Sequence, residues 1–185
     1  MLDIEEDGEV LTEDELYAQC VGLLFAGHET TRNLIGNGMY TLLRYPEEMD
    51  KLREDPELIR TAVEELLRFE SPVQLTSRVA KEEMEVCSVR VGQGQPVLFM
   101  LGAANRDPRQ FKDPDGLNLR RLNNLHLAFG AGAHFCLGNQ LARLEGQIAI
   151  LALVQQFPRM RLAEQQVEWA PNFGLRGLKA LPVIV

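Results

Sequence analysis

This chain of 185 residues has no proline before Pro46, and that absence limits how its N-terminal part can fold. Thr12 and Glu15 have the spacing of a capping box, in which each side chain accepts a hydrogen bond from the other residue's backbone N–H. A helix is therefore predicted to begin at Thr12 and to run for about thirty residues, or about 45–50 Å. Its middle, Val21 to Ala26, is apolar without a break, which predicts a helix covered on most sides inside a large structure.

Two further helices are predicted after this one. Pro46 and Pro56 suit first-turn positions, where a helix has no N–H to lose, and Asp55 can cap the second of these helices. That second helix carries an apolar stripe at helical spacing, which predicts one buried face. The stripe consists of Leu58, Ile59, Ala62, Val63, Leu66 and Leu67.

The remaining sequence mixes short strands, loops and one long helix. Apolar residues punctuated by glycine and proline predict strands and hairpins over residues 71–101. A loop-rich stretch over 105–135 precedes a long helix from about Gly138 to Phe157, which Pro158 ends, and turns and short strands follow. The predicted fold class is α+β, mostly helical, without an internal repeat.

Composition argues against several classes of function. A formal charge of −8 and a pI near 5.0 disfavour nucleic-acid binding, and no apolar stretch is long enough to span a membrane, so we expect a cytoplasmic protein. The three cysteines lack the CxxC spacing of zinc sites and do not suggest a disulfide framework. Residues 1–10 are predicted to be a mobile acidic lead-in, because the first fifteen residues include eight acids and no base.

Cys136 lies in the glycine-rich segment from Phe129 to Gly138, immediately before the last long helix. Its glycines let the backbone turn tightly and approach a flat ligand closely. A thiolate at this position receives the positive end of the helix dipole and hydrogen bonds from the N–H groups that follow it, which suits an iron ligand. The alternative is a small buried hydrophobe, which is the interpretation we adopt for Cys20 and Cys87.

The long first helix contains a second candidate segment, Ala26-Gly27-His28-Glu29-Thr30-Thr31. A glycine inside a helix costs roughly 1 kcal/mol, and opening of the helix at Gly27 would explain it. The Thr30 hydroxyl can bond back to the preceding turn and bend the helix. A solvated helix face is the alternative for Glu29, but an ionised carboxylate after an apolar run needs a partner.

Together these segments resemble the cytochrome P-450 family. Every fixed position of the pattern FxxGxHxCxG is filled around Cys136, and the segments Ala26 to Thr31 and Glu65-Leu66-Leu67-Arg68 resemble the oxygen-activation and ExxR motifs in the family's order. The resemblance implies the C-terminal part of the P-450 fold, with haem bound through the Cys136 thiolate. The further positions that it assigns to cofactor binding are Ala26, Gly27, Phe129, Gly130 and Gly138.

The resemblance also implies roles for other side chains. Glu29 and Thr30 would deliver protons during oxygen activation, Arg78 and His134 would contact haem propionates, and His126 is left open. His28 is expected on a helix face. A structural brace would unite Glu65 and Arg68 with Arg121, which ends a DPDxFDxxR-like segment. The segment departs from that pattern at Leu117 and Asn118, where the family more often has phenylalanine and aspartate.

As a family member the chain would be a haem-thiolate monooxygenase that acts on a small organic substrate. A ferredoxin-like or flavin redox partner is expected to dock near the Cys136 loop, which has basic residues around it. These are Arg109, Lys112, Arg120, Arg121 and Arg143. Family members are roughly twice this length, so the N-terminal half is expected to lie before Met1. The alternative is a non-catalytic remnant that folds as a homo-oligomer or needs an N-terminal segment in trans.

Overall fold

A computed structural model describes residues 5–6, 9–164 and 166–185, and it confirms a mostly helical α+β fold. The helices are α1 (Glu13–Arg44), α2 (Pro46–Glu54), α3 (Ile59–Phe69), α4 (Leu101–Ala104) and α5 (Asn139–Gln156), with 3-10 turns η1 (Pro56–Leu58) and η2 (Gly132–His134). The strands are β1 (Glu5–Glu6), β2 (Glu9–Val10), β3 (Thr76–Val79), β4 (Met84–Val86), β5 (Val89–Val91), β6 (Pro96–Phe99), β7 (Arg161–Leu162) and β8 (Val183–Ile184).

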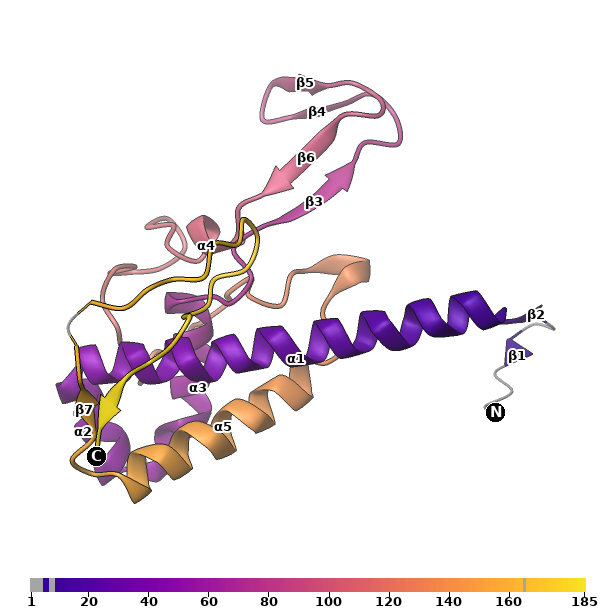
Figure 1. Ribbon diagram of the computed structural model, residues 1–185. Coiled ribbons are helices and arrows are strands. Elements are labelled where there is room, and N and C mark those ends of the chain that lie inside the picture. Colours follow the sequence, from indigo (N-terminus) through magenta and orange to yellow (C-terminus); the bar gives the residue numbers. More distant parts are fainter. Residues whose placement is uncertain (1–4, 7–8, 165) are drawn as a thin grey trace.

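The strands form small antiparallel pairs, β1 with β2, β3 with β6, β4 with β5 and β7 with β8. The β3–β6 and β4–β5 pairs extend away from the helices in Figure 1. The predicted lead-in lies partly outside the described residues, which omit 1–4 and 7–8, and within it β1 pairs with β2. No helix in the described part of the chain is long and apolar enough to cross a membrane.

Helix α1 begins and ends where the sequence predicts. The Thr12 N–H donates to Glu15 Oε2 at 2.9 Å and the Glu15 N–H donates to Thr12 Oγ1 at 3.3 Å, which completes the capping box. The helix ends at Arg44, two residues before Pro46. Its C-terminal half is buried from Asn33 onward, whereas its N-terminal half projects beyond the other helices (Figure 1).

The apolar middle of α1 is uncovered in this chain. Val21 is 66% exposed, Leu24 is 73% exposed and Phe25 is 66% exposed. The prediction that this segment is surrounded is therefore not met by the 185 residues themselves. The segment is helical as predicted, but these side chains stay exposed among the residues that the structure describes.

The two prolines act as expected, but Asp55 does not. Pro46 occupies the first turn of α2, and Pro56 begins η1, which leads into α3. Asp55 makes no side-chain cap, so that prediction is wrong. Its carboxylate instead accepts a hydrogen bond from Arg120 Nη2 at 3.3 Å, which competes for the oxygen that a cap would use.

The core lies where the buried half of α1 packs against α3 and α5. Two glycines allow the helices to approach closely. A Cβ on Gly38 would lie 3.0 Å from Ile150 Cδ1, and a Cβ on Gly146 would lie 3.0 Å from Leu34 Cδ2. This close packing fixes the position of α5, and with it the loop that precedes α5.

Candidate functional site

The Cys136 loop is a compact turn held by its own backbone. Gly130 and Gly132 have φ angles of +70° and +73°, which a residue with a Cβ adopts only with strain. The Cys136 N–H donates to the Phe129 carbonyl at 3.0 Å and the Phe135 N–H donates to the Gly132 carbonyl at 3.0 Å. Gly138 is the N-cap of α5, so Cys136 lies three residues before Asn139, the first residue of that helix.

The surroundings of Cys136 fit a flat apolar ligand with a metal at its centre. The thiol is partly exposed, and the neighbouring Phe135 and Leu137 are 47% and 88% exposed. A Cβ placed on Gly27 of α1 or on Gly138 would meet no heavy atom within 4 Å. A single thiolate donor with apolar neighbours and open glycine surfaces matches the chemistry of haem ligation.

The α1 motif combines a backbone-bonded hydroxyl with a paired acid. Thr30 Oγ1 donates to the Ala26 carbonyl at 2.7 Å, which is the predicted bond to the preceding turn. The Glu29 carboxylate accepts from Arg32 Nη2 at 2.7 Å, so Arg32 is the partner that an acid after an apolar run requires. The predicted opening of the helix at Gly27 is not present. Helix α1 runs without a break from Glu13 to Arg44, so the backbone stays helical before and after Gly27.

Glu65, Arg68 and Arg121 meet in the interior. Arg68 Nε and Nη2 donate to the two Glu65 oxygens at 2.8 and 2.9 Å, and Arg121 Nε donates to Glu65 Oε2 at 3.0 Å. The Glu65 and Arg68 side chains are fully buried. Further donors and acceptors satisfy them, including the Asn118 N–H and the Asn105 and Pro114 carbonyls. This arrangement is a buried network that joins α3 to the loops after α4 and is unlike a surface ion pair.

The departures from the usual family pattern are accommodated. Leu117 is buried in the core at 8% exposure, and the Asn118 N–H donates to Glu65 Oε1 at 3.0 Å. Asn118 Oδ1 also accepts from the Arg120 N–H at 3.0 Å. With these two residues the loop still packs into the core, through Leu117, and still binds the Glu65 carboxylate, through the Asn118 N–H.

Arg78 and His134 are exposed and come from different elements. Arg78 lies on β3, where its Nη1 donates to the Ser77 carbonyl at 2.7 Å and to Thr76 Oγ1 at 3.2 Å. His134 ends η2. Neither side chain forms an ion pair within the described ranges. The Arg78 guanidinium and the His134 ring can therefore each donate a hydrogen bond to a carboxylate.

His126 belongs to a cluster that the sequence did not reveal. Glu64 Oε2 lies 3.1 Å from His126 Nε2, and Arg143 donates to both Glu64 oxygens at 2.7 and 3.0 Å. The Ala128 N–H donates to His126 Nδ1 at 3.2 Å, and the other ring nitrogen, Nε2, faces the Glu64 carboxylate. His126 therefore has an internal partner, whereas His28 lies exposed on α1 as expected.

The electrostatics of this cluster are set by opposing effects. Burial raises the pKa of Glu64, but the hydrogen bonds from His126 and Arg143, together with the positive charges of both partners, outweigh it and lower that pKa to about 2. Residues far apart in sequence make these contacts, and no local spacing in the sequence indicates them.

Asn105 is a second functional position that the sequence did not reveal. It is fully buried, its Oδ1 accepts from the Leu127 N–H at 2.7 Å and its Nδ2 donates to Ser71 Oγ at 2.7 Å. Its carbonyl accepts from Arg68 Nη1 at 2.9 Å. Asn105 thus connects the brace to the start of the segment that leads to Cys136.

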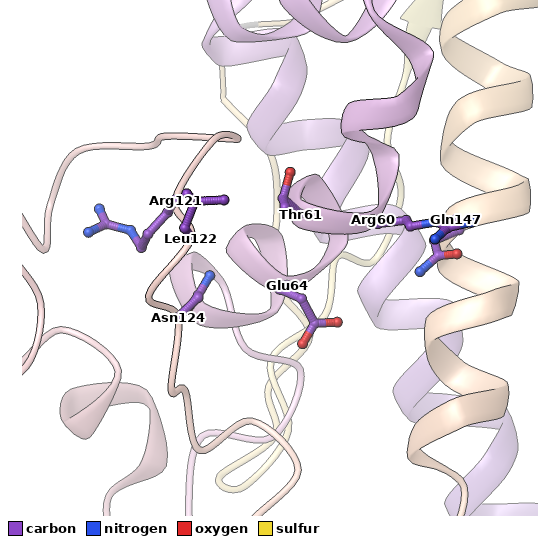
Figure 2. Close-up of a pocket in the computed structure, with 7 residues that line it drawn as sticks. All are labelled: Arg60, Thr61, Glu64, Arg121, Leu122, Asn124 and Gln147. Atoms are coloured by element: carbon purple, nitrogen blue, oxygen red, sulfur yellow. The ribbon is translucent and has the colours of Figure 1, made fainter.

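A polar cavity of about 430 Å³ lies on the side of α3 that carries Glu64. Figure 2 shows it between α3, the loop of residues 121–124 and α5. The lining residues are Arg60, Thr61, Glu64, Arg121, Leu122, Asn124 and Gln147. None of the predicted cofactor-binding residues lines it, so this cavity is distinct from the Cys136 loop.

The basic residues expected near the Cys136 loop are largely neutralised. Arg109 pairs with Asp107 at 2.7 Å, Arg120 pairs with Asp55 at 3.3 Å, and the other two arginines bind Glu65 and Glu64 as described above. Lys112 alone of the five has no carboxylate partner in the part of the chain that the structure describes. The local excess of positive charge is therefore smaller than the sequence suggests.

The fold and the glycine-rich cysteine loop fit a haem-binding class of protein. The family described as Cytochrome P450 matches residues 1–60 and 55–178 of the chain. The chain belongs to the cytochrome P450 family.

Relatives and solved structures agree with this assignment. The chain is 53% identical over 173 residues to the biotin biosynthesis cytochrome P450 of Bacillus subtilis, covering 94% of the chain and 44% of that protein. It is 47% identical over 182 residues to the polyketide biosynthesis cytochrome P450 PksS of the same organism, covering 97% of the chain and 45% of that protein. The chain thus spans about half the length of the curated relatives it matches.

Among solved structures, P450BioI in complex with an acyl carrier protein ligated to hexadec-9Z-enoic acid superposes with a TM-score of 0.92 at 52% identity. This match covers 95% of the chain and 46% of that structure. The PksS structure also gives a TM-score of 0.92, at 47% identity, and covers 97% of the chain and 47% of that structure. The helices and hairpins described above therefore have the arrangement of a P450 fold.

Proposed function

We propose that this chain is the haem-binding C-terminal region of a haem-thiolate monooxygenase, with Cys136 as the iron ligand. The observation that carries the proposal is the Cys136 loop, in which a partly exposed thiol precedes α5 within a tight glycine turn. When bound, haem supplies the activation of dioxygen and the insertion of one oxygen atom into an organic substrate. The identity to cytochrome P450s over nearly the whole chain supports the same assignment.

The residues of the chain would hold the cofactor from several sides. Cys136 would ligate the iron through its thiolate, and Arg78 and His134 would donate to the propionates. Ala26 and Gly27 on α1, with Phe129, Gly130 and Gly138 in the loop, would present small or apolar surface to the porphyrin faces. The brace of Glu65, Arg68 and Arg121 would keep the loop region in place, without touching the cofactor.

Glu29 and Thr30 would deliver protons during oxygen activation. The Thr30 hydroxyl donates to the Ala26 carbonyl, and its oxygen retains lone pairs with which it can accept a proton or hold a water. The Glu29 carboxylate is held by Arg32 one turn away and can exchange a proton with solvent. These two groups lie in adjacent positions on α1, and we assign them to proton delivery.

A redox protein, ferredoxin-like or flavin-containing, would supply electrons one at a time, and a small organic molecule would be the substrate. We place the redox protein near the Cys136 loop, because electron transfer is favoured where the ligand residue comes close to the surface. Lys112, which has no carboxylate partner among the described residues, can steer an acidic carrier to this region.

A second function has one observation in its favour. The exposed apolar segment of α1 shows that the chain leaves a large apolar surface uncovered, which suits a non-catalytic fragment that associates with another chain. In that case the chain would fold without a competent haem pocket.

The reduced carbon monoxide difference spectrum of the haem-loaded chain tests the proposal. We expect the red-shifted band of a thiolate-ligated haem in the unaltered chain and its loss in Cys136→Ser. Cys87→Ser is the matched control, because Cys87 lies in the β4–β5 turn. A red-shifted band that persists in Cys136→Ser would contradict the ligand assignment, and the absence of haem binding in the unaltered chain would favour the second function.

A further inference from the structure

A continuous series of polar contacts joins α3 to the backbone of Cys136. Arg143 Nε and Nη2 donate to the Glu64 carboxylate at 2.7 and 3.0 Å, and Arg143 Nη1 donates to Asn139 Oδ1 at 2.7 Å. Asn139 Nδ2 then donates to the Cys136 carbonyl at 2.7 Å. Each contact uses a different donor atom, so all of them form at the same time.

Both backbone polar groups of Cys136 are thereby fixed. Its N–H donates to the Phe129 carbonyl at 3.0 Å, and its carbonyl accepts from the Asn139 side chain and, at 3.3 Å, from the Asn139 N–H. The Arg143 guanidinium also lies over the Phe129 ring, 4.4 Å from its centroid. One arginine on α5 therefore contacts both residues that hold the cysteine backbone.

We propose that Asn139, Arg143 and Glu64 form a positioning relay, which fixes the Cys136 peptide and tunes the electron donation of its thiolate. A donor to the carbonyl of a ligand residue withdraws electron density from that residue and restricts its movement. The Glu64–Arg143 pair alone would suffice to join α3 to α5. Asn139 connects this pair to Cys136. Its Oδ1 accepts a hydrogen bond from Arg143, and its Nδ2 donates one to the Cys136 carbonyl.

The first test needs no cofactor. Asn139→Leu keeps the side-chain size but removes both polar atoms, and Gln140→Leu removes an exposed amide from the next position of α5 as the control. We expect the alkylation rate of Cys136, measured against the exposed Cys87 of the same chain, to rise about fivefold in Asn139→Leu, the factor that one net hydrogen bond represents. Arg143→Leu should give a similar rise, and Gln140→Leu should give none.

The second test uses the haem-loaded chain and rests on the proposed function. Loss of the donor leaves more electron density on the thiolate, so the reduction potential should become more negative in Asn139→Leu and in Arg143→Leu. The double variant should show no further shift, because both changes break one series of contacts. A shift that is fully additive would contradict a relay.

The two tests separate failure of the relay from failure of the proposed function. The opposing result is that the variants lower only the melting temperature and leave the alkylation ratio and the reduction potential at the values of the unaltered chain. That result would overturn the inference, because the three residues would then only connect two helices. Absence of a red-shifted carbon monoxide band in the haem-loaded unaltered chain would overturn haem ligation by Cys136, and the alkylation ratio would then decide the relay on its own.

Discussion

The carboxylate of Glu64 shows what a single partly buried acid contributes. Its pKa falls from an ordinary value of 4.5 to about 2 because His126 and Arg143 favour the charged form against the cost of burial. The sequence does not single this residue out, since its neighbour Glu65 carries the recognisable motif. The two adjacent acids face different partners, and only the fold brings those partners together.

The depressed pKa of Glu64 predicts a specific dependence of stability on pH. The stabilisation is complete above about pH 4.5 and is lost as the pH falls toward 2, because the folded state binds the proton less readily than the unfolded state. Glu64→Gln should lower the free energy of unfolding at pH 7 by less than about 3 kcal/mol, because solvent screens the partly exposed carboxylate, and should flatten its decline below pH 4.5. Urea unfolding at several pH values measures both effects.

Glu57→Gln is the control for this prediction, because Glu57 is an exposed acid on η1 close to the same helix. It should leave the pH profile unchanged. Parallel profiles for Glu64→Gln and the unaltered chain would show that the carboxylate contributes nothing through ionisation.

Thr30 predicts an effect on coupling and none on folding. Thr30→Ala removes the hydroxyl that donates to the Ala26 carbonyl, while alanine has the higher helix propensity, so helix stability should not fall. In the haem-loaded protein with its redox partner, we expect unchanged haem content and a larger share of electrons diverted to peroxide or water. Thr31→Ala is the neighbouring control. Equal product yield per electron in Thr30→Ala and the unaltered protein would remove Thr30 from proton delivery.

At the scale of elements, the ends of helices were predictable and their contacts were not. Thr12, Glu15 and Pro46 specify the limits of α1 through local hydrogen bonding and the missing proline N–H, and both limits appear in the sequence. The crossing of α1 and α5 depends on Gly38 and Gly146, whose contacts lie far apart in the chain. The local spacing of residues carries no information about such contacts, so the sequence could not predict how α5 packs against α1.

The candidate site follows the same division. The Cys136 loop and the Glu65–Arg68 pair were found because their motifs are contiguous. Asn105 and the partners of His126 were missed because each bonds to residues distant in sequence. The prediction for Asp55 failed because Arg120, from a different loop, takes its carboxylate.

Helix α3 should depend on its buried ion pair for stability. Glu65→Ala leaves Arg68 and Arg121 without their shared carboxylate, and breaking a buried pair typically costs about 3–5 kcal/mol. We expect a correspondingly lower free energy of unfolding and the loss of haem incorporation, although Glu65 lies in the brace and not among the predicted haem contacts. Glu168→Gln, which breaks an exposed pair with Lys179, should change neither quantity.

Thermal or urea unfolding and haem titration measure the two effects of Glu65→Ala separately. Normal haem incorporation together with an unchanged free energy of unfolding would show that the network contributes no more than a surface pair.

At the scale of the whole molecule, the pairing of the arginines predicts weak electrostatic steering of a redox partner. Only Lys112 of the five basic residues near the loop lacks a carboxylate partner among the described residues. Electron transfer should therefore slow only modestly as ionic strength rises, since exposed charges are screened over about 8 Å at physiological salt. Lys112→Glu should slow it further, whereas Lys81→Glu, after β3, should not. A steep salt dependence that Lys112→Glu leaves unchanged would place the docking surface elsewhere.

The exposed segment of α1 predicts that the isolated chain associates. Val21, Leu23, Leu24 and Phe25 are 66%, 62%, 73% and 66% exposed, and the four are consecutive but for one glycine. At about 25 cal/mol per Å² of apolar surface, leaving these side chains in water costs several kcal/mol, which is comparable to the stability of a whole domain. A second copy, or an N-terminal segment supplied in trans, would remove that cost by covering the helix.

Sedimentation velocity over a range of concentrations tests this association. We expect an oligomer for the unaltered chain and a shift toward monomer in Leu24→Lys, because a lysine in the covered face must lose its hydration. Leu122→Lys is the control, since Leu122 is 90% exposed but lies in the loop beside the Figure 2 cavity. Haem occupancy should be low in the unaltered chain and should rise when the N-terminal segment of a relative is added. A monodisperse monomer that binds haem stoichiometrically would show that the apolar face of α1 needs no partner.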